Sequence, residues 1–553
     1  MIAGVLGSSL YSTSVIHGDS YSSKAQTQYA KPKISLFARG SIYFSGKNGT
    51  QSAAASVESG YVLFMNPKLV TDANGTYEAL SNYISLDRAT FLTKARKSND
   101  LYEELAVKVG EKVALPIQAL GLKGIGITQE TWRAYPGGSL AAHELGIIGQ
   151  NAASSSISGR YGLERYYDKV LLRNDAGSSM NVFAQLFSDF NSVFSGNVDS
   201  GDLVTSIEPT VEAYLEKILS QAQAIWNPDE IGGIIMDPNT GEIYAMASHP
   251  TFDPNDLKSV KSAAIFSNPL VEHVYEMGSI MKPLTMAAAL DSGAEEVDST
   301  YDDLGCLVLN EKKICNFDQK ARGVISMQQI LSQSLNIGAA TIALETGTRD
   351  FVRYFLSFGI GAKSGIDLPS EAMPLIDNLK NPQDIDIATA SYGQGIAVSP
   401  IGMIKALSII ANGGYLVTPH IVRRIERTDG IVKTIDVKRT GPVLKPQTAD
   451  DVKRMLITVV DTALAQGKLK RERHTIAAKT GTAAIADHVN GGYYSDRWLH
   501  SFFGFFPAYN PKFIIFLYQV YPKGAKYASE TLVKPFDDLT TFLINYYNIP
   551  PDR

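Results

Sequence analysis

Several features that would place this 553-residue chain in a special class are scarce or missing. Charged residues make up 19% of it, with a net charge of -5 and no long basic or acidic run, which argues against the charged surface that nucleic acid requires. No repeat of fixed period occurs, which excludes solenoids and propellers. Two cysteines allow one intrachain disulfide at most. What remains is an ordinary globular composition, 44% hydrophobic, without low-complexity segments.

A long hydrophobic run is also missing at the N-terminus. Residues 1–10 are mostly apolar, but this stretch is too short to span a bilayer, and no basic residue precedes it as in a secretory signal. Two interpretations stay open: a frayed N-terminal helix, or the end of a membrane anchor whose beginning is missing.

The chain is too long for one hydrophobic core, and its pattern changes near residues 210–228. Residues 20–210 mix short strand-like and helical stretches. Strand patterns at 232–247 and 500–520 then lie at the two ends of the second part, which also contains helical segments at 210–224, 281–290, 326–344, 400–411 and 532–547. This order predicts an α+β domain whose antiparallel sheet takes strands from both ends.

The two cysteines, Cys306 and Cys315, lie at equal distances in sequence from Asn310-Glu311. If those two residues form the turn of a hairpin, the cysteines face each other at a non-hydrogen-bonded position, where side chains are closest. A disulfide and a pair of reduced thiols are both compatible with this spacing.

The tetrad Ser279-Ile280-Met281-Lys282 is the first motif that suggests chemistry. Pro283 places the serine at the start of a helix, because proline would break a helix interior. There the Ser279 N–H lacks an intrahelical partner and can donate to an oxyanion. Lys282 lies on the same face and can accept the hydroxyl proton if burial and a second cation lower its pKa. Alone, such a tetrad more often reflects a helix-capping serine beside an unrelated lysine.

Two more motifs follow in order. Ser334-Leu-Asn336 offers a hydroxyl and an amide that can relay protons and hold a peptide carbonyl, although by itself it is a polar helix start. Lys479-Thr480-Gly481, followed by Thr482, lies in a strand pattern that points the lysine and glycine to one face and the threonines to the other.

Each member of the Lys479 strand has a chemical use. Lys479 supplies a second cation, the glycine permits close approach of another backbone such as a substrate strand, and the threonine hydroxyls can bind a terminal carboxylate. A bare Lys-Thr-Gly is usually a solvated turn. The catalytic interpretation therefore depends on the three motifs occurring together in this order.

Together the three motifs resemble those of the penicillin-interacting serine transpeptidases. The resemblance runs from about residue 200 to the end and includes Tyr275-Glu-Met-Gly278, Ser391-Tyr-Gly-Gln-Gly395 and Asn412-Gly-Gly414. It implies an α+β transpeptidase domain in which helices flank an antiparallel sheet.

The N-terminal part resembles the non-catalytic motifs of the class B penicillin-binding proteins. Arg133-Ala-Tyr-Pro136 and the segment at 159–168 match them. The motif that starts at Arg39 departs, because Phe44 stands where an acidic residue is expected and Asn48-Gly49 is displaced. Because these motifs carry no reaction, the departure bears on the contacts of an elongated pedestal and not on the catalytic chemistry. The resemblance divides the chain into a remnant of a membrane anchor at 1–20, a dimerisation-like pedestal at 21–215 and a transpeptidase domain at 216–553.

The resemblance implies peptidoglycan cross-linking outside the cytoplasmic membrane. Ser279 would attack the D-alanyl-D-alanine bond of one stem peptide, with Lys282 as base, and the acyl group would pass to an amine of a neighbouring stem. β-Lactams would acylate the same serine. The further roles it implies are proton transfer by Ser334 and Lys479, binding of the donor peptide by Asn336, carboxylate binding by Thr480 and Thr482 beside Gly481, and an oxyanion hole made by the N–H groups of Ser279 and Thr482.

The implied partners are peptidoglycan stem peptides, β-lactam antibiotics and a membrane glycosyltransferase of the wall-synthesis machinery, and no metal or organic cofactor is implied. A single N-terminal membrane helix is implied too, which favours the truncated-anchor interpretation of residues 1–20. An extracytoplasmic position also favours the Cys306–Cys315 disulfide.

Other activities fit part of this pattern. A β-lactamase shares the tetrad and the Lys-Thr-Gly strand, but it needs a fast deacylating base and has no use for a pedestal. A D,D-carboxypeptidase differs only in using water as acceptor, which the motifs do not exclude. A catalytically silent β-lactam sensor is disfavoured by three intact motifs, and a second, glycosyltransferase domain is disfavoured because nothing before residue 210 resembles one.

Overall fold

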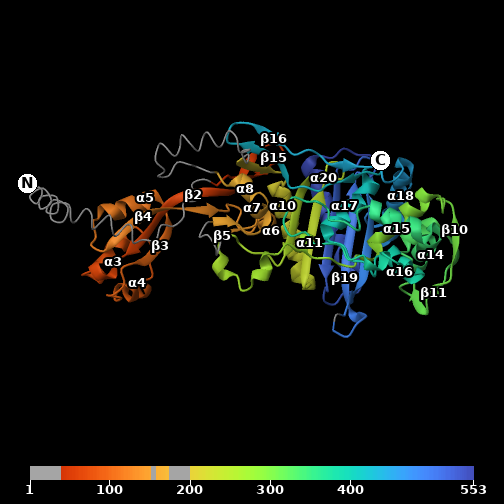
Figure 1. Cartoon of the computed structure of the whole chain (residues 1–553), viewed down its shortest axis with the longest axis horizontal. Coiled ribbons are helices and arrows are strands. Elements are labelled where there is room, and N and C mark those ends of the chain that lie inside the picture. Colours follow the sequence, from red (N-terminus) through yellow and green to blue (C-terminus); the bar gives the residue numbers. More distant parts are fainter. Residues whose placement is uncertain (1–38, 151–156, 174–199, 488) are drawn as a thin grey trace, which may run out of the picture.

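The computed structural model describes residues 39–150, 157–173, 200–487 and 489–553. The molecule is elongated, with a narrow N-terminal head at one end and a broad mixed α/β body at the other (Figure 1). The expected anchor at residues 1–20 lies outside the described residues. Among the helices that are described, none combines the length and the apolar character that a membrane span requires.

The body is built on a five-stranded antiparallel sheet in the order β18-β19-β20-β8-β9. Its first two strands in sequence and its last three come from opposite ends of the domain, which confirms the predicted α+β arrangement. The strands are β8 Glu230–Met236, β9 Ile243–His249, β18 Ala477–Ala486, β19 Tyr493–Phe506 and β20 Phe513–Val520.

Helices cover both faces of this sheet. α10 (Pro209–Trp226) and α20 (Val533–Tyr547) lie on one face, where two glycines let them approach closely. A Cβ on Gly233 would lie 3.0 Å from a Leu215 methyl of α10, and one on Gly504 would lie 2.5 Å from the Phe536 ring of α20. The absence of side chains at these two positions therefore sets the distance between the helices and the sheet.

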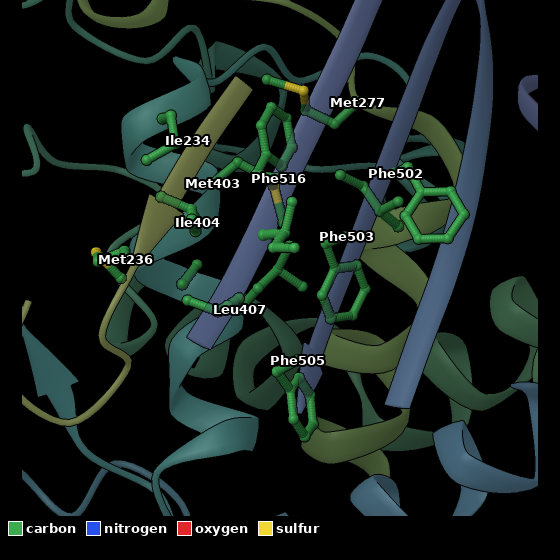
Figure 2. Close-up of a cluster of buried hydrophobic side chains, with 14 of the residues drawn as sticks. Ile234, Met236, Met277, Met403, Ile404, Leu407, Phe502, Phe503, Phe505 and Phe516 are labelled. Carbon is green, nitrogen blue, oxygen red and sulfur yellow. The ribbon is translucent and has the colours of Figure 1, made fainter. Parts of the chain in front are cut away.

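The other face carries the central core. Figure 2 shows Met403, Ile404 and Leu407 of α17 (Pro400–Ala411) against Phe516 of β20, with further side chains of the sheet around them. The spacing of the α17 residues places them on one side of the helix, so a single helix face fills this part of the core. The remaining helices of the body are α11 Pro269–Glu272, α12 Lys282–Ser292, α13 Met327–Ser332, α14 Asn336–Thr346, α15 Thr348–Ser357, α16 Asp384–Ser391, α18 Pro446–Thr458 and α19 Ala528–Thr531.

One predicted helix is wrong as a single element. The segment 326–344 forms two helices, α13 and α14, that are separated at Gln333–Leu335. Ser334 adopts φ +55° there, a left-handed conformation that no helix interior contains. The sequence has no glycine or proline at this break, so periodicity alone could not reveal it.

The pedestal contains a seven-stranded sheet in the order β16-β15-β7-β1-β2-β3, with β4 also paired to β2. β15 and β16 follow α17 in sequence, so the C-terminal half of the chain completes the pedestal sheet, and the predicted division at residue 216 falls inside the continuous helix α10. The strands are β1 Ile42–Ser45, β2 Gln51–Met65, β3 Glu103–Val109, β4 Ile125–Ala134, β7 Gly201–Thr205, β15 Val422–Arg427 and β16 Val432–Thr434.

The head forms around the distal end of β2 and has its own small core. Its helices are α3 Ala73–Ser81, α4 Arg88–Ala95 and α5 Glu111–Ala119. Shorter elements of the chain are α6 Ala142–Leu145, α7 Gly162–Tyr166, α8 Asp168–Leu171, β5 Ile148–Gln150, β6 Ile157–Gly159, β10 Thr300–Asp303, β11 Cys306–Leu309, β12 Lys312–Cys315, β13 Gly323–Ser326, β14 Leu416–Val417 and β17 Arg439–Thr440.

The three pedestal motifs meet in one buried ion network. The fully buried Glu164 accepts from Arg39 Nε at 2.6 Å and from Arg133 Nε at 2.6 Å, and Arg39 also donates to Asp168 at 2.9 Å. Phe44, the departure from the expected acidic residue, lies 2% exposed in the main core. The motifs therefore hold together segments that are more than 100 residues apart, and Phe44 contributes apolar packing.

Three carboxyl groups are packed together where the pedestal meets the body. Glu144 of α6 is 1% exposed and Glu212 of α10 is 0% exposed, with Glu216 one turn further along α10. Burial raises the pKa of Glu144 to about 8 and that of Glu216 to about 7. Burial, together with the charges of the other two groups, holds the pKa of Glu212 well above its usual value. The folded protein therefore retains protons here that the unfolded chain releases near pH 4.5.

We expect Glu212→Gln to become progressively more stable than the wild type as pH rises from 5 to 8. A carboxyl group whose pKa is raised by folding stabilises the protein below about pH 4.5 and loses that contribution as pH rises through its folded value. The amide does not titrate, so the free energy of unfolding of the variant, measured relative to that of the wild type, should be higher at pH 8 than at pH 5. Thermal unfolding at both pH values measures this, with the exposed Glu58→Gln as control, and parallel pH profiles of variant and wild type would refute the expectation.

Candidate active site

The Ser279 tetrad lies at the entrance to a helix, as the sequence predicts. Residues Gly278–Met281 form one 3₁₀ turn that leads directly into α12, with Pro283 at the second helical position. Gly278 has φ +64°, and a Cβ there would lie 2.9 Å from the carbonyl oxygen of Thr482. The glycine therefore allows the turn to approach strand β18, and Ser279 is half-buried beside it.

Lys282 is buried among hydrogen-bond acceptors, with 1% of its surface exposed. Its Nζ donates to the carbonyl of Ser334 at 2.6 Å, to Oδ1 of Asn336 at 2.9 Å and to Oγ of Ser334 at 3.3 Å. Burial, and then the positive charge of Lys479, hold the pKa of Lys282 well below its usual value. These are the two conditions that a lysine must meet to act as a base at neutral pH.

Ser334 joins the two lysines. Its hydroxyl oxygen accepts from Lys282 Nζ at 3.3 Å and from Lys479 Nζ at 3.0 Å. The left-handed conformation at the break between α13 and α14 places the hydroxyl between them. A proton can therefore pass along a continuous chain of polar atoms.

Lys479 is 3% exposed and also donates to the carbonyl of Thr480 at 3.0 Å. Burial lowers the pKa of Lys479 to about 7. Near neutral pH its charged and neutral forms are thus both populated, which suits a group that accepts and returns a proton.

Gly481 leaves room for a backbone segment of the chain itself. A Cβ on it would lie 2.7 Å from the carbonyl oxygen of Met277 and 3.1 Å from the amide nitrogen of Ile280. The nucleophile turn therefore packs closely against β18 at this position, and the approach of a substrate strand to β18 stays a prediction. Ser501 Oγ, on the neighbouring strand, fixes the same turn by donating to the Met277 carbonyl at 2.7 Å.

The threonines lie on the other side of β18, as the predicted alternation requires. Thr480 and Thr482 are half-buried, whereas Lys479 and Gly481 are buried. The Thr482 hydroxyl oxygen accepts from the amide of Ala528 at 3.0 Å, which leaves its proton available to donate.

A cavity of about 760 Å³ connects these side chains. Six of the predicted site residues line it, while Lys282 and Gly481 lie beneath its wall. The six are Ser279, Ser334, Asn336, Lys479, Thr480 and Thr482. Within the described ranges, no group of three or more His, Cys, Asp or Glu side chains is arranged to hold a metal ion.

Sequence reasoning missed three of the four aromatic residues that line the cavity, all except Tyr392 of the Ser391–Gly395 segment. Phe317, Trp498 and Tyr527 line it, and Lys526 Nζ lies 5.6 Å from the centre of the Trp498 ring. They come from a loop after β12, from β19 and from the loop after β20, so no local pattern could group them.

Comparisons with known proteins agree with this geometry. The family model described as "Penicillin binding protein transpeptidase domain" matches residues 231–538, more than half of the chain, and that described as "Penicillin-binding Protein dimerisation domain" matches residues 37–185. The chain belongs to the class B penicillin-binding proteins. This protein is thus a serine-type penicillin-binding transpeptidase with an N-terminal dimerisation domain.

Relatives of this penicillin-binding protein align over most of its length. It is 28% identical to Stage V sporulation protein D of Bacillus subtilis, covering 88% of this chain and 75% of the relative. It is 25% identical to Peptidoglycan D,D-transpeptidase FtsI of Escherichia coli K12, covering 89% and 81%.

Solved structures share the fold. Penicillin Binding Protein 2X from Streptococcus thermophilus superposes with a TM-score of 0.74 at 20% identity, covering 93% of this chain and 80% of that one. Penicillin binding protein 3 from Mycobacterium tuberculosis, complexed with aztreonam, gives a TM-score of 0.70 at 22% identity, covering 93% and 97%.

Proposed function

We propose that this protein cross-links peptidoglycan by serine acyl transfer. Ser279 attacks the carbonyl between the two terminal D-alanines of a donor stem peptide, the last D-alanine leaves, and an amine of a neighbouring stem takes the acyl group from the serine. The observation that carries the proposal is the contact chain Lys282–Ser334–Lys479 beside Ser279 on one cavity. Relatives named peptidoglycan D,D-transpeptidase support the substrate class.

In the acylation step, neutral Lys282 takes the proton of the Ser279 hydroxyl as its oxygen bonds to the peptide carbonyl. The lowered pKa of Lys282 supports this role, because it increases the fraction of free base that can accept the proton. The backbone N–H groups of Ser279 and Thr482 stabilise the oxyanion. The close approach of the nucleophile turn to β18 at Gly278 and Gly481 supports that pairing.

Departure of D-alanine needs a proton on its nitrogen. The proton taken by Lys282 moves through the Ser334 hydroxyl, with Lys479 as the second donor, to this leaving amine. Thr480 and Thr482 bind the terminal carboxylate of the donor, and Asn336 holds the donor backbone. The reverse proton path then activates the incoming amine, which releases the acyl group as a new peptide bond.

The surroundings of the enzyme are also proposed. We infer that it acts on the outer side of the cytoplasmic membrane, with residues 1–20 belonging to its anchor, residues 21–215 acting as a pedestal and residues 216–553 carrying the reaction. The strands β15 and β16 of this last part complete the pedestal sheet. A membrane glycosyltransferase that polymerises the glycan strands is the expected partner. β-Lactams acylate Ser279 as substrate mimics.

A combined assay tests the proposal. The purified enzyme is given a pentapeptide donor and a labelled D-amino acid as acceptor, and both released D-alanine and labelled peptide are measured. We expect labelled product together with D-alanine, and a single burst with nitrocefin without sustained turnover. D-Alanine release without labelled product would indicate a carboxypeptidase, sustained nitrocefin hydrolysis a β-lactamase, and acylation without either product a sensor.

A further inference from the structure

The hairpin β11–β12 contacts the second catalytic motif at its closed base. Cys306 and Cys315 are the first pair of the hairpin and are joined by a disulfide, with their Cα atoms 4.1 Å apart. The turn falls at Asn310-Glu311, as the sequence predicts, and both residues have positive φ, 46° and 64°. The chain has no other cysteine, so a reducing agent can break no other disulfide within it.

The carbonyl of Cys315 sets the orientation of the Asn336 amide. Asn336 Nδ2 donates to that carbonyl at 3.0 Å, so the other end of the amide, Oδ1, faces Lys282 Nζ at 2.9 Å. A carbonyl group can only accept, and it therefore fixes which end of the amide points away from the lysine. A displacement of Cys315 would therefore also displace the Asn336 oxygen that contacts Lys282.

The next residue, Asn316, holds the start of helix α14. Its Oδ1 accepts from the amide of Ile337 at 3.1 Å, an N–H in the first turn that has no intrahelical partner. Its Nδ2 donates to both oxygens of the buried Asp303, at 2.9 and 3.0 Å. The base of the hairpin thus holds both the side chain of Asn336 and the helix terminus that carries it.

Packing against the body holds only part of the hairpin. Ile314 is 9% exposed in the main core and Leu307 and Leu309 pack against that core, whereas Val308 is 68% exposed. A two-stranded hairpin is marginally stable by itself. The Cys306–Cys315 cross-link closes it next to the contact with Asn336.

We propose that the Cys306–Cys315 hairpin is a positioning element for acylation, which holds the Cys315 carbonyl and Asn316 so that Asn336 Oδ1 faces Lys282. This inference rests on the proposed function. It adds a positioning role for hairpin residues that do not line the cavity. Reduction by a dithiol breaks the S–S bond, forms two thiols with the two protons and electrons of the dithiol, and converts the dithiol to a cyclic disulfide. The reduced hairpin then holds Asn336 less firmly.

Acylation by a fluorescent penicillin separates positioning from binding. The oxidised enzyme, the dithiol-reduced enzyme and a Cys306→Ser/Cys315→Ser variant are compared for the acylation rate constant and for the dissociation constant of the non-covalent complex, well below each melting temperature. We expect acylation to slow about tenfold after reduction and in the variant, since small displacements of catalytic groups have effects of this order, with the dissociation constant nearly unchanged. The cysteine-free variant should not respond to the dithiol.

A second variant distinguishes loss of positioning from poor folding of the cysteine-free protein. Glu311→Gly in that background removes the unfavourable side chain from a positive-φ turn position and should recover part of the rate, while the same change in the oxidised wild type leaves the rate unaltered. Equal acylation rates of reduced and oxidised wild type would overturn the inference while the proposed function stands, and so would a change confined to the dissociation constant. Failure of the oxidised enzyme to label at all would overturn both.

Discussion

Replacement of Ser279 by alanine is expected to abolish covalent labelling by penicillin, with a fall in acylation rate of roughly 10⁴-fold or more. The methyl group cannot form the ester bond. Among the hydroxyl groups that line the cavity, that of Ser334 is the one that contacts both Lys282 and Lys479 in the described part of the chain. Gel fluorescence after exposure to a fluorescent penicillin, with the time course followed over hours, measures the change.

The matched control is Ser292→Ala at the opposite end of the same helix, where the hydroxyl donates only to the Ala289 carbonyl. It should label at the wild-type rate. Label retained in Ser279→Ala would show that another side chain is the nucleophile, with Ser334 as the first to examine.

Replacement of Lys282 by methionine should lower the acylation rate by roughly 10³-fold while the protein stays folded. Methionine has a similar length and fits the buried site, but it cannot accept the Ser279 proton. The wild-type rate should reach its plateau well below the pH at which an ordinary lysine loses its proton, because burial and the Lys479 charge lower the pKa of Lys282. Stopped-flow acylation between pH 6 and 10 measures both effects.

Lys405→Met is the control for removing a partly buried lysine. Lys405 lies on α17, donates to the Ser364 carbonyl at 2.9 Å and does not line the cavity. Its loss should affect melting temperature but not acylation at a temperature where the protein is folded. A wild-type rate that continues to rise steeply up to pH 10 would mean that Lys282 keeps an ordinary pKa and is not the base.

The features of the fold that could be predicted are those encoded by local pattern. The strands β8 and β20 are continuous apolar runs, and Pro283 and Pro400 mark helix starts, so the sheet with strands from both ends and helices α12 and α17 follow from the sequence. The addition of β15 to the pedestal sheet could not be predicted, because it depends on pairing with β7 more than 200 residues away.

The candidate site shows the same limit. The order of the three motifs identified Ser279, Ser334 and Lys479, but their meeting depends on the left-handed conformation of Ser334, which no neighbouring glycine or proline signals. Gly481 indicates that a backbone segment approaches closely, but the sequence does not reveal that the nucleophile turn is such a segment. Both features depend on contacts between segments that are far apart in the chain, and a single sequence does not reveal which distant segments meet.

Peptide mapping of the acyl-enzyme by mass spectrometry tests the central claim most directly. The enzyme is stopped with acid shortly after mixing with a β-lactam, and separately with a pentapeptide donor, and then digested. The account predicts that both reagents leave their acyl group on the same peptide, as an ester of Ser279. An adduct on any other residue, or a donor that is turned over without an ester at Ser279, would contradict it.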